Sequence, residues 1–408
     1  MVARLAWRSI WRNKRRTIIT VVSIGMGLAF AIFFIAFAEG VYLELIDSGV
    51  RMQAGHITLE HPEYREAPAI DLFLTDPTNS RREIEKIKQV QSTKLLVQAQ
   101  GVARTGFGTA GVGIMGVEPS VEARTSPIVQ SIIKGRYLED GDGPLVVVGT
   151  KLAQRLHLKA GKKMVITTND STGALTEQLY RVVGIFETGT TEIDNYLLQM
   201  PISSARTLYN LPPGSATQLG VILAKSESLN KVLNQIRSMV GQNPAKAYPW
   251  QEIMPEVASY IRMDKGSNLV FQGILLFLIL FTIYNTILMS VVERQKEFAV
   301  LLALGTPPGL LRKQVFAESI FLGLIGCGSG IVVGGLASYA LQVWGLDIST
   351  FYSEGLSISG FGVSSVMHAK VTVGLLLWMG GIVLGVTLLL SIFPMRKAAR
   401  VPIVDTLR

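Results

Sequence analysis

Four long stretches without a charged residue constrain the fold of this chain more than any other feature. They lie between Arg16 and Glu39, between Lys265 and Glu293, between Glu318 and Asp347, and between Lys370 and Arg396. A transmembrane helix needs about 20 apolar residues, so each stretch is long enough to cross a bilayer. Only 17% of the 408 residues are charged, against about 25% in soluble domains. We therefore expect an α-helical membrane protein with four transmembrane helices.

Basic residues gather on one side of these stretches. They are Arg4, Arg8, Arg12, Lys14, Arg15 and Arg16 before the first; Arg294, Lys296, Arg312 and Lys313 between the second and third; and Arg396, Lys397, Arg400 and Arg408 after the fourth. Loops rich in Lys and Arg stay in the cytoplasm, which places both termini and the middle loop there. Because the basic residues border apolar runs, the net charge of +9 does not indicate a nucleic-acid partner.

This topology divides the chain into nine segments. The cytoplasmic parts are an amphipathic start at 1–17, a coupling helix and loop at 293–314, and a tail at 395–408. The transmembrane helices are expected at 18–38, 268–292, 315–345 and 371–394. Outside lie one large domain at 39–267 and a loop at 346–370. The alternative for the first helix is a cleaved signal peptide ending near Ala36-Phe37-Ala38, although its apolar run exceeds the usual ~7–15 residues.

The large outside domain is predicted to be mixed α+β, inserted between transmembrane helices 1 and 2. Runs rich in β-branched residues predict strands at Gly55–Glu60, Leu95–Ala103, Leu145–Val148, Met164–Thr168 and Tyr180–Phe186. Helical periodicity favours helices at Ser80–Val90, Lys151–Leu156, Ser203–Tyr209 and Leu229–Val240. The apolar face from Trp250 to Ile261 fits either a membrane-proximal helix or an ordinary core helix.

The chain shows no constellation typical of an enzyme. There is no GxxxxGK[ST] phosphate-binding loop, since Ala160-Gly161-Lys162-Lys163 lacks the upstream glycine spacing and the hydroxyl residue. We therefore expect no catalytic residue and no cofactor on this chain. His56 and His61 lie near Glu60 and Glu63, but their spacing is not typical of a metal site, and solvated surface histidines are the simpler interpretation.

Small residues recur at helical spacing in the third and fourth stretches. Gly326, Gly330 and Gly334 are four residues apart, as are Gly381 and Gly385. Small residues at this spacing let helix backbones approach closely. The glycines can serve packing within one protomer or an interface with a second copy, and the pattern alone leaves both open.

The second apolar stretch runs into a charged amphipathic segment, Glu293–Gly305. Four charged residues, Glu293, Arg294, Lys296 and Glu297, precede apolar residues that include Phe298 and Leu301. Gly305 is followed by Thr306-Pro307-Pro308, which ends a helix. The segment predicts either a cytoplasmic helix that docks on another protein or a loop that only anchors two transmembrane helices.

Residues 292–305, VERQKEFAVLLALG, closely resemble the coupling-helix signature of FtsX-like permeases, the type VII ABC transporters. Residues 7–17 look like the amphipathic start of this family, and residues 394–408 like its C-terminal tail. Residues 180–211 are similar to the outside domain of its lipoprotein-releasing LolC and LolE branch. The resemblance covers nearly the whole chain, although a fused ATPase domain like that of MacB is missing.

The resemblance implies a permease in the bacterial inner membrane, with its large MacB-like domain in the periplasm. It implies a dimer, formed with a second copy or a sister permease. Two copies of a separate ABC ATPase would bind ATP and Mg. The implied contacts to that ATPase are Glu293, Arg294, Lys296 and Glu297 as polar residues, Phe298 and Leu301 as apolar anchors, and Gly305 as the end of the coupling helix.

The lipoprotein-releasing branch also implies a lipid cavity between transmembrane helices 1 and 2. In this chain it points to Phe30, Phe33, Phe34, Phe37, Met263, Leu269, Phe271, Ile274 and Leu278. The simpler interpretation of the phenylalanines is a lipid-facing surface. The implied cargo is a lipoprotein or a similar amphiphile taken from the outer leaflet, passed on to a periplasmic carrier.

Two other functions stay open at this point. The permease could transmit force to a periplasmic partner, such as an efflux adaptor or a cell-wall hydrolase, and carry no substrate itself. Alternatively, the chain could be a passive scaffold or receptor, which the coupling-helix signature argues against.

Overall fold

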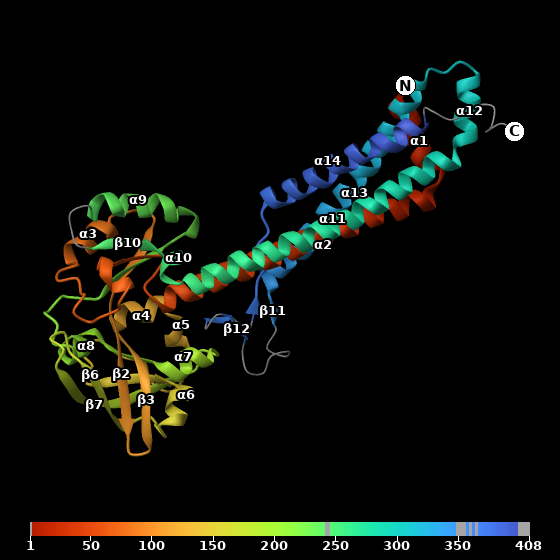
Figure 1. The fold of residues 1–408 in the computed structure, drawn as a ribbon. Helices are drawn as coiled ribbons and strands as arrows, with labels where there is room; N and C mark the ends of the chain where they lie inside the picture. Colours follow the sequence, from red (N-terminus) through yellow and green to blue (C-terminus); the bar gives the residue numbers. More distant parts are fainter. Residues whose placement is uncertain (1, 241–244, 348–355, 359–360, 364–365, 399–408) are drawn as a thin grey trace. The chain divides into compact units, whose positions relative to one another are not determined.

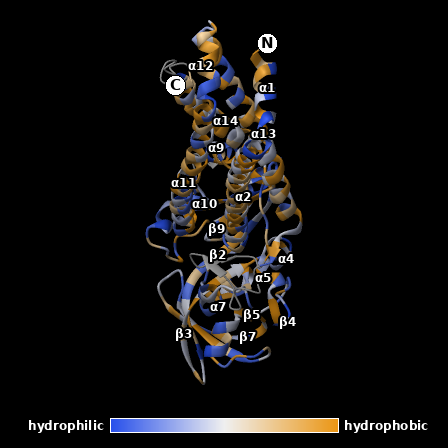
Figure 2. Ribbon diagram, turned by 90° about the vertical axis from the view of Figure 1, so that its right-hand side faces the viewer, coloured by the Kyte–Doolittle hydropathy of each residue, from blue (hydrophilic) through white to orange (hydrophobic). Residues whose placement is uncertain are grey.

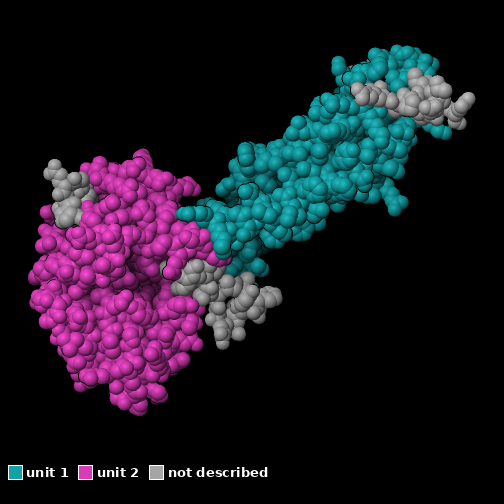
Figure 3. All heavy atoms as spheres, in the orientation of Figure 1, with its two compact units in different colours: residues 1–42, 262–347, 366–408 teal, residues 43–261, 348–365 magenta. Residues whose placement is uncertain are grey.

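The computed structural model describes residues 2–240, 245–347, 356–358, 361–363 and 366–398 of the chain. These residues form two compact units, which Figure 3 colours separately. Unit 1 comprises residues 1–42, 262–347 and 366–408, and unit 2 comprises residues 43–261 and 348–365. The last ten residues of the predicted cytoplasmic tail, 399–408, lie outside the described residues.

Unit 1 is built from long apolar helices (Figure 1). They are α1 (Val2–Arg12), α2 (Lys14–Met52), α11 (Pro255–Glu293), α12 (Gln295–Ala303), α13 (Pro308–Trp344) and α14 (Val373–Ala398). Four of them, α2, α11, α13 and α14, are long and apolar enough to cross a membrane, and hydrophobic residues follow them in Figure 2. The predicted class, four membrane helices with a large α/β domain between the first two, is therefore confirmed.

All four candidate membrane helices extend beyond the predicted transmembrane stretches at one end or both. Helices α2 and α11 contain 39 residues each, and both contribute residues to unit 1 and to unit 2. Helix α2 passes through Ala36, which is fully buried, without a break. Two short antiparallel strands, β11 (Leu346–Asp347) and β14 (Val366–Met367), complete unit 1.

The glycines of α13 pack against α2 within the protomer. A Cβ added to Gly330 would lie 2.8 Å from the carbonyl oxygen of Gly25, and one added to Gly334 would lie 2.8 Å from the Cα of Ala29. Of the two interpretations of this stripe, the structure favours packing within one protomer. Gly381 and Gly385 of α14 differ, because an added Cβ would meet nothing within 4 Å in the described residues.

Unit 2 contains a ten-stranded sheet in the order β10-β1-β9-β2-β3-β8-β5-β7-β4, with β6 between β2 and β7. The strands are β1 (Ile57–Glu60), β2 (Val90–Thr105), β3 (Gly108–Val117), β4 (Ile132–Gly135), β5 (Leu145–Gly149), β6 (Lys163–Asn169), β7 (Leu175–Phe186), β8 (Leu197–Pro201), β9 (Gln218–Leu223) and β10 (Lys246–Pro249). The pairings β2-β3-β8-β5-β7-β6-β2 close a ring. In this ring each strand has a partner on both edges over at least part of its length, which limits the free edges available for pairing with other chains.

Short helices connect these strands. They are α3 (Thr78–Glu85), α4 (Pro119–Thr125), α5 (Pro127–Gln130), α6 (Thr150–Arg155), α7 (Thr191–Tyr196), α8 (Ile202–Leu208), α9 (Leu229–Val240) and α10 (Trp250–Ile253), with 3-10 turns at Pro62–Arg65 and Ser226–Ser228. A hairpin of β12 (Leu356–Ile358) and β13 (Phe361–Val363) also belongs to unit 2.

The five predicted strands and three of the four predicted helices are confirmed. The helix expected at Ser80–Val90 is shorter, because α3 ends at Glu85 and Val90 already begins β2. The apolar face near Trp250 belongs to the core of unit 2, since Trp250, Met254, Val257 and Ile261 are all buried. Since Val257 and Ile261 are in the first turns of α11, the segment packs in the core of unit 2 and also continues into the second candidate membrane helix.

A buried ion pair holds the end of α2 inside unit 2. Lys94 of β2 and Glu122 of α4 lie 2.9 Å apart, and each side chain is 1% exposed. The Lys94 ammonium group also donates a hydrogen bond of 2.8 Å to the carbonyl oxygen of Arg51. Arg51 lies in the last turn of α2, where helix carbonyl groups lack a partner within the helix.

His56 is buried in unit 2, so the prediction of a solvated surface histidine is wrong for this residue. Its Nε2 lies 3.1 Å from the Ser226 hydroxyl, and its Nδ1 accepts a hydrogen bond from the Leu223 N–H. His56 directly precedes β1, and the alternation of residues around it does not predict this burial. Among the described residues, no group of three potential ligands could hold a metal ion.

The stability of unit 2 should fall in mild acid because of His56. Burial lowers its pKa to about 4, while the unfolded chain binds the proton near pH 6.5. The stabilising effect of the neutral imidazole is present above pH ~6.5 and decreases by about 3 kcal/mol as the pH falls toward ~4. Denaturant titrations of the wild type and His56→Gln over this range test the prediction. Equal pH dependence in both proteins would contradict it.

Candidate functional site

The coupling segment, residues 293–305, does not continue α11 without interruption. Helix α11 ends at Glu293 and α12 begins at Gln295, because Arg294 leaves the helical conformation with φ −103° and ψ 12°. Figure 1 shows α12 turned away from the line of α11.

Arg294 is the centre of a polar cluster in unit 1. Its guanidinium group donates hydrogen bonds to the carboxylates of Glu318 (2.8 Å) and Glu297 (3.0 Å) and to the Ser9 hydroxyl (2.7 Å). Burial opposes its charge, but the two carboxylates outweigh this effect and raise its pKa. Arg294 therefore connects α1, α12 and α13 at the residue where the helix breaks.

Two further ion pairs attach the coupling segment to the N-terminal helices. Arg12 of α1 lies 2.6 Å from Glu297, and Arg16 of α2 lies 2.8 Å from Glu293. Because both pairs are partly exposed, each contributes about 0.2–1 kcal/mol. Three of the four charged residues predicted to contact an ATPase thus have partners within the protomer, whereas Lys296 is exposed.

The apolar residues of α12 divide into a buried and an exposed group. Phe298 is fully buried and packs in the core of unit 1 with residues such as Val291 and Leu311. Its ring also lies under the Arg294 guanidinium group, 5.0 Å away. An anchor for a partner must be accessible, so the prediction of this role for Phe298 is corrected.

The exposed group forms an apolar face on α12. Val300 is 45% exposed, Leu301 36% and Leu304 77%. Leu304, the C-cap residue of α12, was not among the predicted contacts, although its i+3 spacing from Leu301 places both on the same side of the helix end. Gly305 ends the helix with a φ of +88°, a left-handed conformation that glycine adopts without strain. The exposed face therefore ends in a defined turn before α13.

The predicted lipid-cavity residues lie on α2 and α11 of unit 1. Phe33 stacks on Phe37 with a centroid separation of 6.4 Å, and Phe34 of α2 lies 5.9 Å from Phe271 of α11. The exposed members of the set are Phe30, Phe34, Met263, Leu269, Phe271, Ile274 and Leu278, while Phe33 and Phe37 are half-buried. The structure brings Phe34 and Phe271 together, and it leaves most of the set on the surface of the protomer.

A polar cluster near this apolar surface was missed by the sequence analysis. The Tyr42 hydroxyl donates a short hydrogen bond to the Asp264 carboxylate and accepts one from the Asn268 amide (2.8 Å). Lys265 lies 3.2 Å from Glu39. These contacts join α2 to α11. Glu39 and Lys265 mark the ends of two apolar stretches in the sequence. Their opposite charges are the sequence signal that could have predicted a contact between them.

Two family models match the chain. Residues 17–239 match the MacB-like periplasmic core domain, and residues 269–403 match the C-terminal domain of FtsX-like permeases. The first match alone covers more than half of the chain.

Relatives of known name match over most of the length. LolC, a lipoprotein-releasing system transmembrane protein of Neisseria meningitidis serogroup B, is 22% identical over 96% of this chain and 94% of its own. MacB, a macrolide export ATP-binding/permease protein of Nitrosomonas europaea, is 20% identical over 89% of this chain and 55% of its own. The periplasmic region of MacB from Actinobacillus actinomycetemcomitans superposes with a TM-score of 0.36 and 12% identity, over 50% of this chain and 92% of that region.

Proposed function

This chain belongs to the FtsX-like ABC transporter permeases that carry a MacB-like periplasmic core domain, and from that premise we propose that it couples ATP hydrolysis by a separate ATPase to motion of unit 2. Two copies of the ATPase would bind ATP and Mg, and a second copy of the chain or a sister permease would complete the transporter. The proposed cargo is a lipoprotein or a similar amphiphile, extracted from the outer leaflet of the inner membrane.

The exposed apolar face of α12 is the observation that carries this proposal. Val300, Leu301 and Leu304 are exposed on a helix that Arg294 fixes to α1 and α13 through charged hydrogen bonds. A rigidly held helix with an exposed apolar face is suited to receive force from a docked protein. Apolar anchors at the centre of an interface supply most of its affinity, while exposed charges such as Lys296 affect specificity and association rate.

The proposed orientation places α1, α12 and the C-terminal end in the cytoplasm. Its support is the excess of Lys and Arg beside these segments. Force applied to α12 would then pass into α11, whose 39 residues belong partly to unit 1 and partly to unit 2. The same holds for α2, so either helix can carry the motion to the periplasmic domain.

The lipoprotein part of the proposal rests on the phenylalanines of α2 and on a relative. Phe30, Phe33, Phe34 and Phe37 give α2 a continuous aromatic surface that an acyl chain can contact. LolC, named for lipoprotein release, matches 96% of the chain. A periplasmic carrier would receive the released cargo.

The match to MacB supports a second candidate function. MacB is named as a macrolide export protein, and the alternative for this chain is force transmission to a periplasmic partner such as an efflux adaptor or a cell-wall hydrolase. In that case no cargo would contact α2 or α11, so the two functions predict different effects of changing the phenylalanines.

Changing Phe33 and Phe37 together to glutamine should reduce lipoprotein release roughly tenfold or more, because two aromatic rings no longer bury apolar area against the acyl chains. Release is measured in proteoliposomes that contain the permease, its ATPase and a triacylated lipoprotein. Phe393→Gln is the matched control, because Phe393 is an exposed phenylalanine of α14. Unchanged release in the double variant, with ATPase activity retained, would favour force transmission without cargo.

A further inference from the structure

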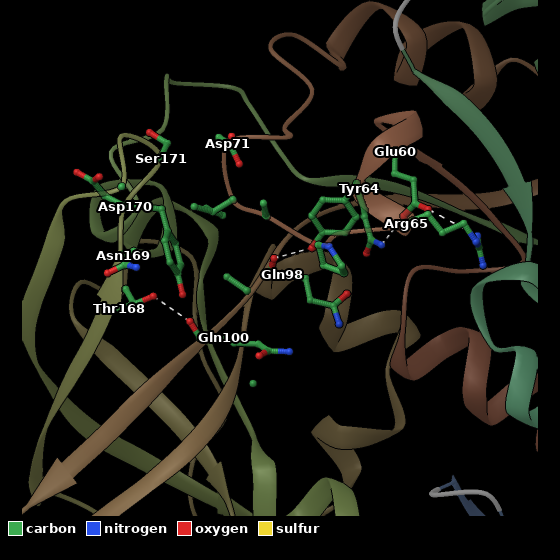
Figure 4. Close-up of a pocket in the computed structure, with 18 of the residues that line it drawn as sticks. Glu60, Tyr64, Arg65, Asp71, Gln98, Gln100, Thr168, Asn169, Asp170 and Ser171 are labelled. Carbon is green, nitrogen blue, oxygen red and sulfur yellow. Dashed lines mark hydrogen bonds and ion pairs between the residues drawn. The ribbon is translucent and has the colours of Figure 1, made fainter.

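Unit 2 contains a polar cleft with a volume of about 1180 Å³. Figure 4 shows its lining, to which β2, the turn after β6 and the segment around the first 3-10 turn contribute. All of these residues belong to unit 2. The cleft is separate from α12 and from the phenylalanines of α2, so the proposed function assigns nothing to it.

The cleft lies where β2 changes its strand partners. Along one edge, β2 pairs with β9 from Val90 to Leu96 and with β6 from Val102 to Arg104. Between them, residues 97–101 pair only with β3 on the opposite edge, as far as the described residues show. Side chains provide hydrogen bonds to some of the backbone groups on the open edge. The hydroxyl groups of Tyr64 and Thr168 donate hydrogen bonds to the carbonyl oxygens of Gln98 and Gln100, respectively. The amide side chains of Gln98 and Gln100 are exposed and line the cleft.

A buried acceptor and a buried donor in the lining have no hydrogen-bond partner among the described residues. Gln218 is 5% exposed; its Nε2 donates to Glu60, but its Oε1 is unpartnered. The Nη1 of Arg65 is also without a hydrogen bond, since the nearest Glu60 oxygen is 3.7 Å away. Leaving such groups unpaired costs about 1–3 kcal/mol each. A ligand that supplies one donor and one acceptor would remove both costs.

The lining also defines the chemistry of that ligand. Five side-chain amides and three tyrosines surround the cleft, with three carboxylates against one guanidinium group; the charged residues are Glu60, Arg65, Asp71 and Asp170. This excess of negative charge disfavours phosphate and other polyanions. The volume exceeds the ~300–1,000 Å³ of ordinary small-molecule sites, which favours a chain over a compact ligand. Burial raises the pKa of Glu60, which a ligand cation would counteract.

We propose that this cleft binds an extended polypeptide segment, neutral or weakly basic. A peptide group supplies an N–H for the Gln218 carbonyl oxygen and a C=O for the free N–H of Arg65. Its amide planes can pack on the exposed ring of Tyr196, and a basic side chain complements Glu60, Asp71 and Asp170. The identity of this segment rests on the proposed function, which it makes more specific. The segment would be the polypeptide part of the lipid-bearing cargo.

Hydrogen–deuterium exchange of the full chain in detergent tests the proposal without ATPase or lipid. The probes are a pool of acetylated, amidated hexapeptides of Ser, Asn, Gln and Lys, and chitohexaose as an uncharged sugar chain of similar length. The peptides should slow exchange at residues 60–71, 97–101 and 168–173, and the sugar should not. No protection by the peptides, or equal protection by the sugar, would overturn the proposal. Neither result would affect the ATPase-coupled release assay, so the two hypotheses fail separately.

Variants at the cleft sharpen the test. Gln218→Met keeps the side-chain size but removes the unpartnered acceptor, and it should weaken peptide protection. Gln98→Ala with Gln100→Ala changes only exposed side chains, so folding should be retained while peptide affinity falls roughly tenfold through lost hydrogen bonds. Gln235→Ala, at an exposed position of α9, is the matched control. Unaltered peptide binding by the Gln98/Gln100 double variant would overturn the assignment of the cleft.

Discussion

Replacing Lys94 with alanine is expected to lower the free energy of unfolding of unit 2 by about 3–5 kcal/mol. The change leaves the Glu122 carboxylate buried, with 1% of its side chain exposed, and without its cation. Within the described part of the chain, Glu122 Oε2 has no hydrogen-bond partner even in the wild type, so the lost cation is not replaced by an existing hydrogen bond to this oxygen. The carbonyl oxygen of Arg51, near the end of α2, also loses its donor. Unit 2 would therefore hold α2 less firmly as well as unfold more readily.

Tryptophan fluorescence can measure this loss in unit 2 alone. Trp250 is the one tryptophan in the sequence of unit 2, and it is 7% exposed. Replacing the other four tryptophans of the chain by phenylalanine therefore makes the fluorescence report on unit 2 alone. Lys88→Ala, at an exposed position beside α3, is the control and should change stability by at most about 0.5 kcal/mol. Lys94→Met with Glu122→Leu should recover most of the stability. A Lys94→Ala effect no larger than that of Lys88→Ala would contradict the role of the pair.

Changing Leu301 and Leu304 together to aspartate should abolish co-purification of the permease with its ATPase. Both residues are exposed, Leu301 in α12 and Leu304 at its C-cap, so the change removes apolar contact area and adds two charges at the surface of unit 1. Loss of a central apolar anchor typically costs 2 kcal/mol or more, which corresponds to a reduction in affinity on the order of 30-fold. The measurement is pull-down from detergent extracts of the native membrane.

Leu175→Asp provides the matched control for this experiment. Leu175 is 71% exposed and belongs to unit 2, where no ATPase contact is proposed. Glu297 is less suitable for the test, because it bonds to Arg12 and Arg294 inside the protomer, and its loss would disturb the cluster itself. Retained co-purification of the Leu301/Leu304 variant would mean that α12 is not the docking site.

The membrane helices and the first strands could be read from the sequence because their signals are local. An uncharged run of more than 20 residues or a run such as Val146-Val147-Val148 needs no knowledge of distant neighbours. Contacts between residues that are remote in the sequence could not be predicted in this way. Arg294 forms a hydrogen bond with Ser9, 285 positions away, and no periodicity of the sequence indicates this contact. Likewise, the apolar spacing of α12 does not distinguish Phe298, which faces the core, from Leu304, which is exposed.

The cleft of unit 2 could not be predicted from the sequence, because the residues that form it are also remote from one another along the chain. It depends on β2 pairing with β9, β3 and β6 along different parts of its length, and β9 and β3 were not predicted as separate strands. Gln218 and Glu60 meet across 158 positions. Their burial follows from sheet topology, which single-sequence patterns do not determine.

The glycine stripe of α13 bears on how such permeases diversify. Gly326, Gly330 and Gly334 are already occupied by α2 of the same protomer, so a second copy has no access to them. In the proposed pairing with a second copy or a sister permease, the choice of partner would therefore depend on other surfaces, such as the face of α14 at Gly381 and Gly385. After a gene duplication, the two copies could acquire different pairing preferences by surface substitutions alone, while the interior of each protomer stayed the same.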